Sequence, residues 1–401
     1  MLQLLVEMSR KFMSETEFCE THLVSVVIPA YNAGEFIDRT LISAINQSYR
    51  HIEIIVVDDG STDDTAARVA RHGSVDPRIR LMSVLNGGVA RARNLGISAA
   101  RGAFVAFLDA DDLWHPDKIR LQLQCMIDSP VWLGGCYAQS RHIDVHDRLL
   151  GDGPSFSAEG YVLARQFAVH LVRNGSCLLV RREVAMLLGG YDPSYADRGI
   201  GGCEDIEFEF KLAARYRIGV VPNYLVGYRL SPGNMSSNRS RMARGLWATV
   251  EAHLELNPSL PRRIRRIAWT KVYEYHIFNN FHDKRLTAVL SGLAMLAATD
   301  LLKACQVVVA LAKKIGQFFE RRMLPVKLYP IRPNFFELPI GPVDVPNHQY
   351  RQDAYLVEQL AEIDALLWSE LQYPDVPLIT NDNLLYQNLL STTGRELHGH
   401  Y

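Results

Sequence analysis

Short apolar runs alternate with stretches of helical character in the first 115 residues, and this alternation restricts the fold more than any other feature. The runs lie at 24–28, 52–57 and 103–108, with a weaker one at 79–84. Pro29 cannot donate to a ladder, so the first run is expected to stop there. Strands joined by helices of this kind pair in parallel through right-handed crossovers. The pattern predicts an α/β fold: a mostly parallel, Rossmann-like sheet flanked by helices.

Capping and glycine residues mark the expected helix starts in this region. Asn32 with Glu35 predicts one start, and Ser61 with Asp64 has the pattern of a capping box for the next. The Ala-rich segment 89–100 is expected to be the third helix.

Polar residues follow three of the predicted strands. Tyr31 and Asn32 come after the first, Asp58 and Asp59 after the second, and 109–112 after the fourth. In open parallel sheets the ligand crevice lies at the carboxyl ends of the strands. We therefore expect these residues to converge on one binding site.

The segment Asp109-Ala110-Asp111 carries the strongest chemical signal. Alternate residues of an extended segment point the same way, so both carboxylates can face one crevice. Mg²⁺ and Mn²⁺ take one or two protein carboxylates together with phosphate oxygens. A metal bridging two phosphates neutralises the charge of a diphosphate leaving group. Solvated or loop-capping aspartates are the alternative, and the preceding apolar strand favours an Mg²⁺ or Mn²⁺ site.

Other residues near the strand ends suit a nucleotide. A carboxylate at Asp58 or Asp59 can accept a hydrogen bond from a base N–H, although Asp59 could instead cap the next helix. Gly88 allows close backbone approach, and Arg91 or Arg93 could reach a phosphate as a planar fork.

A second carboxylate pair, Glu204-Asp205, follows a Gly-rich stretch and opens a predicted helix. The helix dipole stabilises ionised carboxylates at this position. That suits a general base, a role that contributes about 10²–10⁴-fold in rate. A charge that only complements the dipole is the alternative.

Composition narrows the class of partner. The formal net charge of −1 provides no polyelectrolyte surface for nucleic acid. Six scattered cysteines without a C-x-x-C pair favour buried thiols in a reducing compartment over a zinc site. The N-terminus lacks the features of a signal peptide, so cytoplasmic synthesis is expected.

Basic and apolar segments follow the predicted sheet. Residues 262–266 hold four arginines, and the apolar stretch 286–311 contains no uncharged run longer than 14 residues, against the ~20 of a spanning helix. We expect an amphipathic helix there, packed on the protein or lying at a bilayer surface, with 260–315 as a peripheral membrane contact. A Pro-rich connector at 325–346 precedes a helix at 350–371, for which self-association and docking on the catalytic domain both stay open.

Four ordered motifs resemble the family 2 inverting glycosyltransferases of GT-A fold. The motifs are 24–32, 57–63, 86–96 and 107–114, and the likeness continues through 189–192, 204–205 and 228–236. It covers about 23–238, which defines the expected organisation: an extension 1–22, a GT-A domain 23–238, a helical extension 239–324 and a Pro-rich connector with a final helix 325–401.

The resemblance implies roles for the residues. It implies that Asp58 or Asp59 contacts the nucleobase and that Asp109 contacts the ribose or the metal. It also implies that Asp111 binds the metal and the diphosphate, and that Asp205, beside Glu204, is the catalytic base. It favours a UDP-sugar as donor and a single displacement at the anomeric carbon. The implied nucleotide-sugar-binding set is Pro29, Tyr31, Asn32, Asp58, Asp59, Gly88, Arg91, Asp109, Ala110 and Asp111.

Two departures from the family pattern refine this expectation. Ser231 stands where many relatives have His. If that His helps to bind metal or phosphate in the relatives, Ser231, water or Arg229 would have to take its place in this chain. The chain contains no Gln-x-x-Arg-Trp motif, which processive polysaccharide synthases of this family usually have, so a non-processive enzyme is expected. Such an enzyme would add a sugar to a glycan or lipid-linked acceptor in cell-surface polysaccharide or glycoconjugate synthesis. Its expected location is the cytoplasm or the inner face of the cell membrane.

Two other functions share part of this sequence pattern. A nucleotidyltransferase also needs paired aspartates, but it would carry a Gly-rich phosphate loop where this chain has 29–32. A non-catalytic glycan-binding relative is the other, and the presence of Asp109, Asp111 and Asp205 argues against it.

Overall fold

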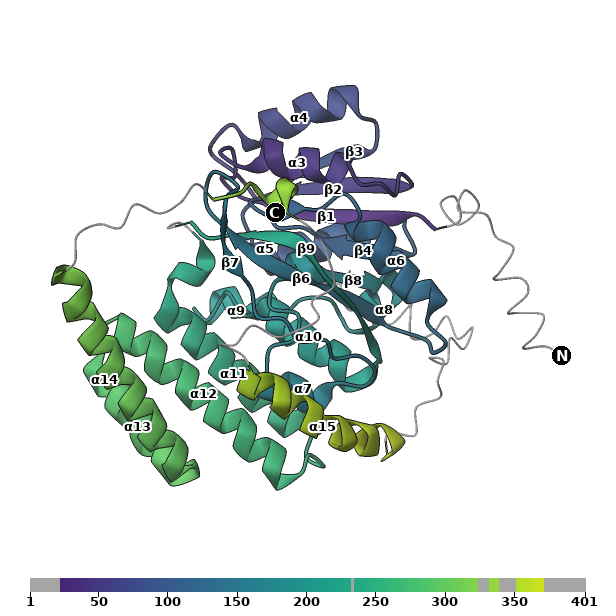
Figure 1. Ribbon diagram of the computed structural model, residues 1–401. Helices are drawn as coiled ribbons and strands as arrows, with labels where there is room; N and C mark the ends of the chain where they lie inside the picture. Colours follow the sequence, from purple (N-terminus) through teal and green to yellow (C-terminus); the bar gives the residue numbers. More distant parts are fainter. Residues whose placement is uncertain (1–21, 232–233, 324–331, 339–350, 371–401) are drawn as a thin grey trace, which may run out of the picture.

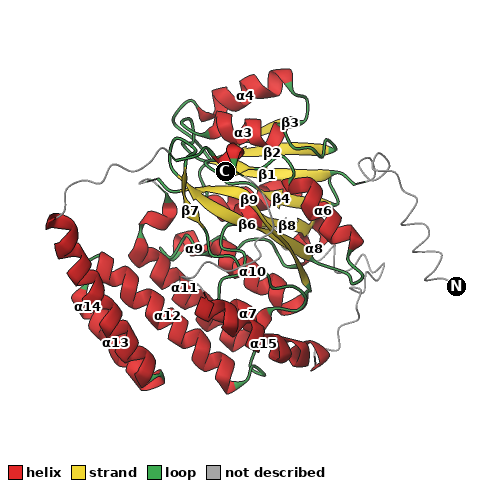
Figure 2. Cartoon of the chain, in the orientation of Figure 1, coloured by secondary structure: helices red, strands yellow, loops and turns green. Residues whose placement is uncertain are grey.

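A central mixed sheet organises the chain, with helices on both of its faces (Figures 1 and 2). The computed structural model describes residues 22–231, 234–323, 332–338 and 351–370. Within these residues nine strands form one sheet in the order β3-β2-β1-β4-β8-β6-β9-β5, and β7 pairs with β6.

The first half of the sheet is parallel, as the sequence predicts. It comprises β1 (Val24–Ala30), β2 (Ile52–Asp58), β3 (Ile79–Ser83) and β4 (Phe104–Phe107). Helices α3 (Ile37–Ile45), α4 (Thr65–Val75) and α5 (Val89–Ala99) connect them. Because Ala30 pairs with Asp58 and Val27 with Phe107, the polar residues that follow these strands share one edge.

The second half introduces antiparallel pairing. Strand β8 (Leu178–Arg181) runs antiparallel to both β4 and β6 (Gly135–Ile143), while β9 (Ile218–Arg229) is parallel to β6. The short β5 (Leu113–Trp114) and β7 (Leu149–Asp152) pair antiparallel with β9 and β6. The remaining helices of this half are α6 (Lys118–Asp128), α7 (Leu163–Ala168), α8 (Arg182–Leu187), α9 (Ser194–Asp197) and α10 (Glu204–Arg215).

Three local expectations are wrong, each for a physical reason. Strand β1 continues through Pro29 to Ala30, since one missing donor near a strand end costs little. Helix α3 starts at Ile37, because Asn32 adopts a positive φ of 47° that no helix start accommodates. Ser61 does not cap α4: its hydroxyl accepts the Asn32 N–H instead, at 2.9 Å.

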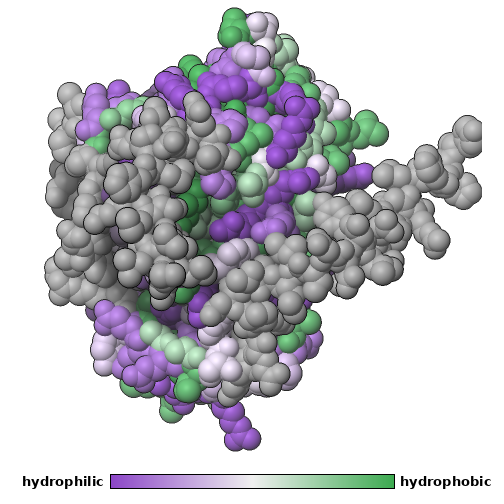
Figure 3. Space-filling view, turned by 90° about the vertical axis from the view of Figure 1, so that its right-hand side faces the viewer, coloured by the Kyte–Doolittle hydropathy of each residue, from purple (hydrophilic) through white to green (hydrophobic). Residues whose placement is uncertain are grey.

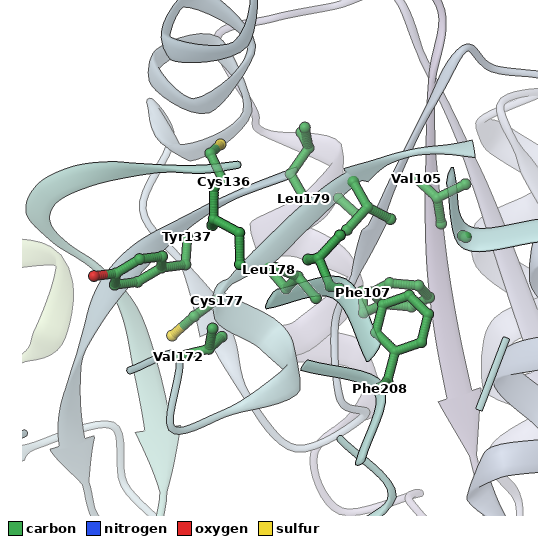
Figure 4. Close-up of a cluster of buried hydrophobic side chains, with 14 of the residues drawn as sticks. Val105, Phe107, Cys136, Tyr137, Val172, Cys177, Leu178, Leu179 and Phe208 are labelled. Atoms are coloured by element: carbon green, nitrogen blue, oxygen red, sulfur yellow. The ribbon is translucent and has the colours of Figure 1, made fainter. Parts of the chain in front are cut away.

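The hydrophobic core lies where the two halves of the sheet meet (Figure 4). Phe107 of β4 meets Phe208 of α10 edge to face, with ring centroids 6.2 Å apart. Leu178 and Leu179 of β8 and Tyr137 of β6 are buried in the same cluster. Full burial on both faces explains why these strands are solidly apolar rather than alternating.

A helical layer follows the sheet. It consists of α11 (Arg239–Leu256), α12 (Arg262–His282), α13 (Leu286–Thr299) and α14 (Leu301–Met323), which lie side by side in Figure 1. The single helix expected over 286–311 is two helices, because the chain becomes extended at Asp300, whose carboxylate caps the second by accepting the Lys303 N–H at 2.9 Å. Within the described residues, no helix is both long and apolar enough to cross a membrane.

The last described helix, α15 (Arg351–Glu370), packs against α7 beside the sheet. Its Asp364 is buried against α7, where its carboxylate accepts the Ala164 N–H at 2.5 Å and pairs with Arg165 at 2.6 Å. Leu360 and Leu367 of the same face join the main core. The apolar face of α15, which self-association would need, is therefore covered by the rest of the protein. The predicted connector 325–346 and extension 1–22 lie almost entirely outside the described residues.

Replacing Asp364 by Ala should destabilise the protein by about 3–5 kcal/mol, because Arg165 would stay buried without its partner. Urea unfolding measures the change. Glu362→Ala, which removes an exposed carboxylate of the same helix, is the matched control and should change the free energy of unfolding by less than about 0.5 kcal/mol. Equal losses in the two variants would contradict the role given to Asp364.

Candidate active site

A cleft of about 1460 Å³ opens at the carboxyl ends of β1, β2 and β4. Its walls come from the loops after these strands, the start of α10, the loop after α7, and helices α11 and α12. The predicted site residues that line it are Pro29, Ala110, Tyr31, Asn32, Asp59, Gly88, Asp109, Asp111, Glu204 and Asp205. Two predicted residues, Asp58 and Arg91, are not part of its lining.

Asn32 joins the first two strand ends. Its side-chain oxygen accepts the Thr62 N–H at 2.8 Å, and its own N–H donates to Ser61. The neighbouring Tyr31 is 53 % exposed at the edge of the cleft, and an exposed aromatic ring there can stack on a base. The loops after β1 and β2 therefore form one wall.

Asp59 holds the backbone turn that precedes α5. Its two carboxylate oxygens accept the N–H groups of Gly87 and Gly88, each at 2.8 Å. Gly88 has a φ of 88°, which favours glycine and makes this turn possible. Asp58 faces the other way and accepts the Ser61 N–H at 3.1 Å. Of the two aspartates offered by the sequence, Asp59 is thus the one at the cleft.

Arg93 lies in the cleft, whereas Arg91 is exposed outside it. The Arg93 guanidinium donates to the Asp109 carboxylate at 2.6 Å and lies 4.9 Å from the Tyr191 ring centroid. It is 4 % exposed, so it is a fixed positive charge inside the site. Both residues follow the same glycine pair, and only the helical rotation of α5 decides which one turns inward.

The loop after β4 brings Asp109 and Asp111 to the cleft and buries Asp112 behind them. Asp112 accepts from the Asn174 amide at 2.9 Å, the Ser176 hydroxyl at 2.7 Å and the Arg229 N–H at 2.9 Å. These bonds tie the loop to the segment before β8 and to the end of β9. In the sequence, Asp112 is only the last of four successive acidic or small residues, 109–112, and this pattern does not distinguish a structural anchor from a metal ligand.

Asp109 and Asp111 form a like-charge pair. Burial raises the pKa of Asp111 to about 6, and the nearby Asp109 charge adds to the increase. A divalent cation relieves such repulsion, and Mg²⁺ or Mn²⁺ needs only one or two protein carboxylates when phosphates supply other ligands. Among the described residues, no group of three or more His, Cys, Asp or Glu side chains is arranged to hold a metal ion, so the Asp109–Asp111 pair fits a metal shared with a phosphate better than an all-protein cage.

Asp205 stands across the cleft at the first turn of α10. Burial raises its pKa to about 6, the Arg93 charge opposes this shift, and Glu204 adds to it. Glu204 itself accepts the Gly202 N–H at 2.6 Å and so holds the turn that precedes the helix. The two neighbouring carboxylates therefore differ in surroundings: Glu204 holds the loop, and Asp205 is a buried cleft carboxylate close to the Arg93 charge.

Ser231, which replaces the family's frequent His, lines the cleft. Its hydroxyl bonds the Asn234 side chain, whose amide donates to the Arg229 carbonyl at 2.5 Å. The Arg229 guanidinium cannot take over a ligand's place, because it is fully buried and pairs with Asp147 at 2.6 Å while its Nε donates to the Asp111 carbonyl.

The far half of the cleft is a region that the sequence did not predict. Arg241 and Met242 of α11 and Tyr275 of α12 line it, opposite the loop after α7. These residues belong to helices with no recognisable motif, and only the folding of the helical layer against the sheet brings them there.

Asp59→Ala should lower the free energy of unfolding by about 2 kcal/mol, since two backbone N–H groups would lose their acceptor. Chemical denaturation tests this. Asp128→Ala removes an exposed carboxylate at the end of α6 and should have little effect. If both variants behave alike, Asp59 does not hold the Gly87–Gly88 turn.

Comparison with known proteins shows what the chain is similar to. Residues 25–186 match the family model "Glycosyl transferase family 2". Chondroitin synthase of Pasteurella multocida (strain Pm70) is 35 % identical over 157 residues, which is 38 % of this chain and 16 % of that protein. The chain thus spans only a small part of this relative.

Solved structures show the same fold at low identity. TarS 1–349 of S. aureus in complex with UDP aligns with a TM-score of 0.52 and 16 % identity, over 81 % of this chain and 98 % of that one. The mannosyltransferase PcManGT from Pyrobaculum calidifontis in complex with GDP-Man and Mn²⁺ gives 0.52 and 19 %, over 92 % and 95 %. The predicted α/β fold with a helical C-terminal part is thereby confirmed. Residues 25–186 thus match a family 2 glycosyltransferase model, and the chain has the GT-A fold.

Proposed function

We propose that this chain is an inverting glycosyltransferase that moves a sugar from a nucleotide diphosphate, with UDP favoured, to an acceptor hydroxyl. One observation carries the proposal: Asp109 and Asp111, which suit a metal–diphosphate, line the same cleft as Asp205, and Arg93 lies between the two groups. The UDP complex of the TarS fold relative supports the donor class.

On the donor side, the walls described above receive the nucleotide. Tyr31 presents its ring to the base, and the turn held by Asp59 permits close backbone approach at Gly88. Asp109 and Asp111 are the residues that would hold Mg²⁺ or Mn²⁺. The bound metal would supply charge neutralisation for the departing diphosphate. The Mn²⁺ in the PcManGT complex supports this choice of cofactor.

On the acceptor side, Asp205 removes the proton from the attacking hydroxyl. Its raised pKa of about 6 leaves it ionised at neutral pH while making it a stronger base than an exposed aspartate. Attack from the face opposite the diphosphate inverts the anomeric carbon in one displacement, with no covalent sugar–enzyme intermediate. The acceptor would occupy the far half of the cleft, between the loop after α7 and helices α11 and α12.

We further propose that the acceptor is a glycan or a lipid-linked glycan of cell-surface polysaccharide synthesis, and that the enzyme adds single sugars at the inner face of the cell membrane. The likeness to a chondroitin synthase supports the acceptor class. The membrane location is developed in the following section.

Asp111→Asn and Asp205→Asn should separate the two halves of the chemistry. Asp111→Asn should abolish the Mn²⁺-dependent stabilisation by UDP in a thermal-shift assay, because half of the carboxylate pair is lost. Asp205→Asn should keep that stabilisation but reduce hydrolysis of the UDP-sugar by about 10²–10⁴-fold, since the base is gone. Full hydrolysis by either variant would sink the proposal, and pyrophosphate release from a nucleoside triphosphate would point to a nucleotidyltransferase.

The rate of donor hydrolysis should rise with pH through about 6 and level off above about 7, because Asp205 acts as a carboxylate and has a pKa of about 6. Arg93→Gln removes the positive charge that lowers the pKa of Asp205, so the midpoint should move to higher pH. Arg91→Gln, outside the cleft, should leave it in place. A midpoint that moves down in Arg93→Gln, or moves equally in both variants, would contradict the assignment.

A further inference from the structure

We propose that one exposed face of the α13–α14 hairpin docks the protein on a bilayer that contains anionic lipids. We call it the α13–α14 face, and its members are Leu286, Leu290, Leu301, Leu302, Cys305, Val308, Val309, Ala312 and Ile315. The proposal deepens the proposed function, because it brings the cleft next to a membrane-anchored acceptor, but the surface is argued from its own residues.

The members on α14 form a continuous stripe. Positions 301, 302, 305, 308, 309 and 312 recur at helical spacing, so they share one side of the helix. Their exposure is high for apolar side chains: Leu302 is 71 % exposed, Leu301 68 % and Val309 54 %. On α13, Leu286 and Leu290 are 67 % and 66 % exposed.

A different side of α14 already packs on the protein. Ala304, Val307 and Leu311 are buried in a small cluster with Ile277 of α12 and Leu296 of α13. The helix is therefore apolar on two sides, and packing satisfies one of them. A helix with apolar residues around most of its circumference is stable only when the second side is also removed from water.

This gathering differs from the other exposed hydrophobic residues of the described chain. Val75 ends α4 and Leu187 ends α8, each at a helix terminus of the sheet region. On the face seen in Figure 3, hydrophilic residues are interspersed with hydrophobic ones among the atoms that are not grey. Single exposed apolar residues are ordinary, whereas a contiguous set marks an interaction surface.

The charges beside the face select an anionic partner. Four basic residues flank the face in the chain: Lys284 and Arg285 precede α13, and Lys313 and Lys314 lie in α14. Lys314 lies 4.8 Å from the Phe278 ring centroid near the end of α12, so the hairpin brings 313–314 to the same end as 284–285. Asp300 is the one acidic residue of segment 284–315, against five basic residues, so a second copy docked by this face would meet mostly like charge. Anionic headgroups supply that charge, with each basic residue strengthening binding about fivefold.

The hairpin also connects this face to the cleft. Lys303, which lines the cleft and pairs with Glu274 at 3.3 Å, projects from a side of α14 away from the stripe. An amphipathic helix lies with its apolar side about 5–10 Å into the headgroup region. A bilayer on the α13–α14 face would therefore be about one helix diameter, ~10 Å, from the far half of the cleft.

Co-sedimentation of the full chain with vesicles tests the proposal. The wild type should bind phosphatidylcholine vesicles that contain phosphatidylglycerol and bind pure phosphatidylcholine much more weakly. Leu302→Glu with Val309→Glu should weaken binding at least about tenfold, because apolar contacts are lost and two charges are placed at the lipid. The matched control is Leu187→Glu with Val75→Glu, the same exchanges at exposed sites elsewhere, and it should bind like the wild type.

Two further measurements make each outcome decisive. Arg285→Gln with Lys313→Gln should weaken binding to the anionic vesicles about fivefold for each charge. UDP-sugar hydrolysis should be equal in all variants, so a loss of vesicle binding with intact hydrolysis separates this proposal from the proposed function. Equal vesicle binding by the stripe variant and the wild type would overturn the proposal. So would a dimer in solution that the stripe variant disperses, since a second copy would then cover the face.

Discussion

The buried carboxylate of Asp112 is the contact on which the site depends. It joins three parts of the chain that are far apart in sequence: the loop after β4, the residues before β8 and the last residue of β9. Burial holds the pKa of this carboxyl well above its ordinary value. Because the site is buried, the hydrogen bonds of Asp112 are formed away from water, where a polar group without a hydrogen-bond partner is costly. Asp109 and Asp111 are positioned at the cleft because Asp112 is held behind them.

Arg93 organises the electrostatics in front of that anchor. It is bound to Asp109, and its charge partly offsets the effect of burial on the pKa of Asp205. One cation therefore influences both the predicted metal-binding aspartate and the predicted base.

The helical layer completes the walls of the cleft. Helices α11 and α12 close the far side, and α15 is held on α7 by the pair of Asp364 with Arg165, so the loop after α7 is braced from behind. In this arrangement α14 has one side next to the cleft and another side exposed. The same layer thus serves the acceptor half of the cleft and the surface that we propose for the bilayer.

The sequence alone determined the parallel half of the sheet and the edge where the polar residues meet, because strand and helix periodicity and strand-end motifs are local properties. It also identified Asp109, Asp111 and Asp205 as cleft residues, and it left Asp58 and Asp59 as alternatives that the structure settled in favour of Asp59. Only the tertiary structure decided between Arg91 and Arg93, made Asp112 an anchor, and brought α11 and α12 to the site. These outcomes depend on helix rotation and on contacts between residues far apart in the chain, and neither leaves a local pattern in the sequence.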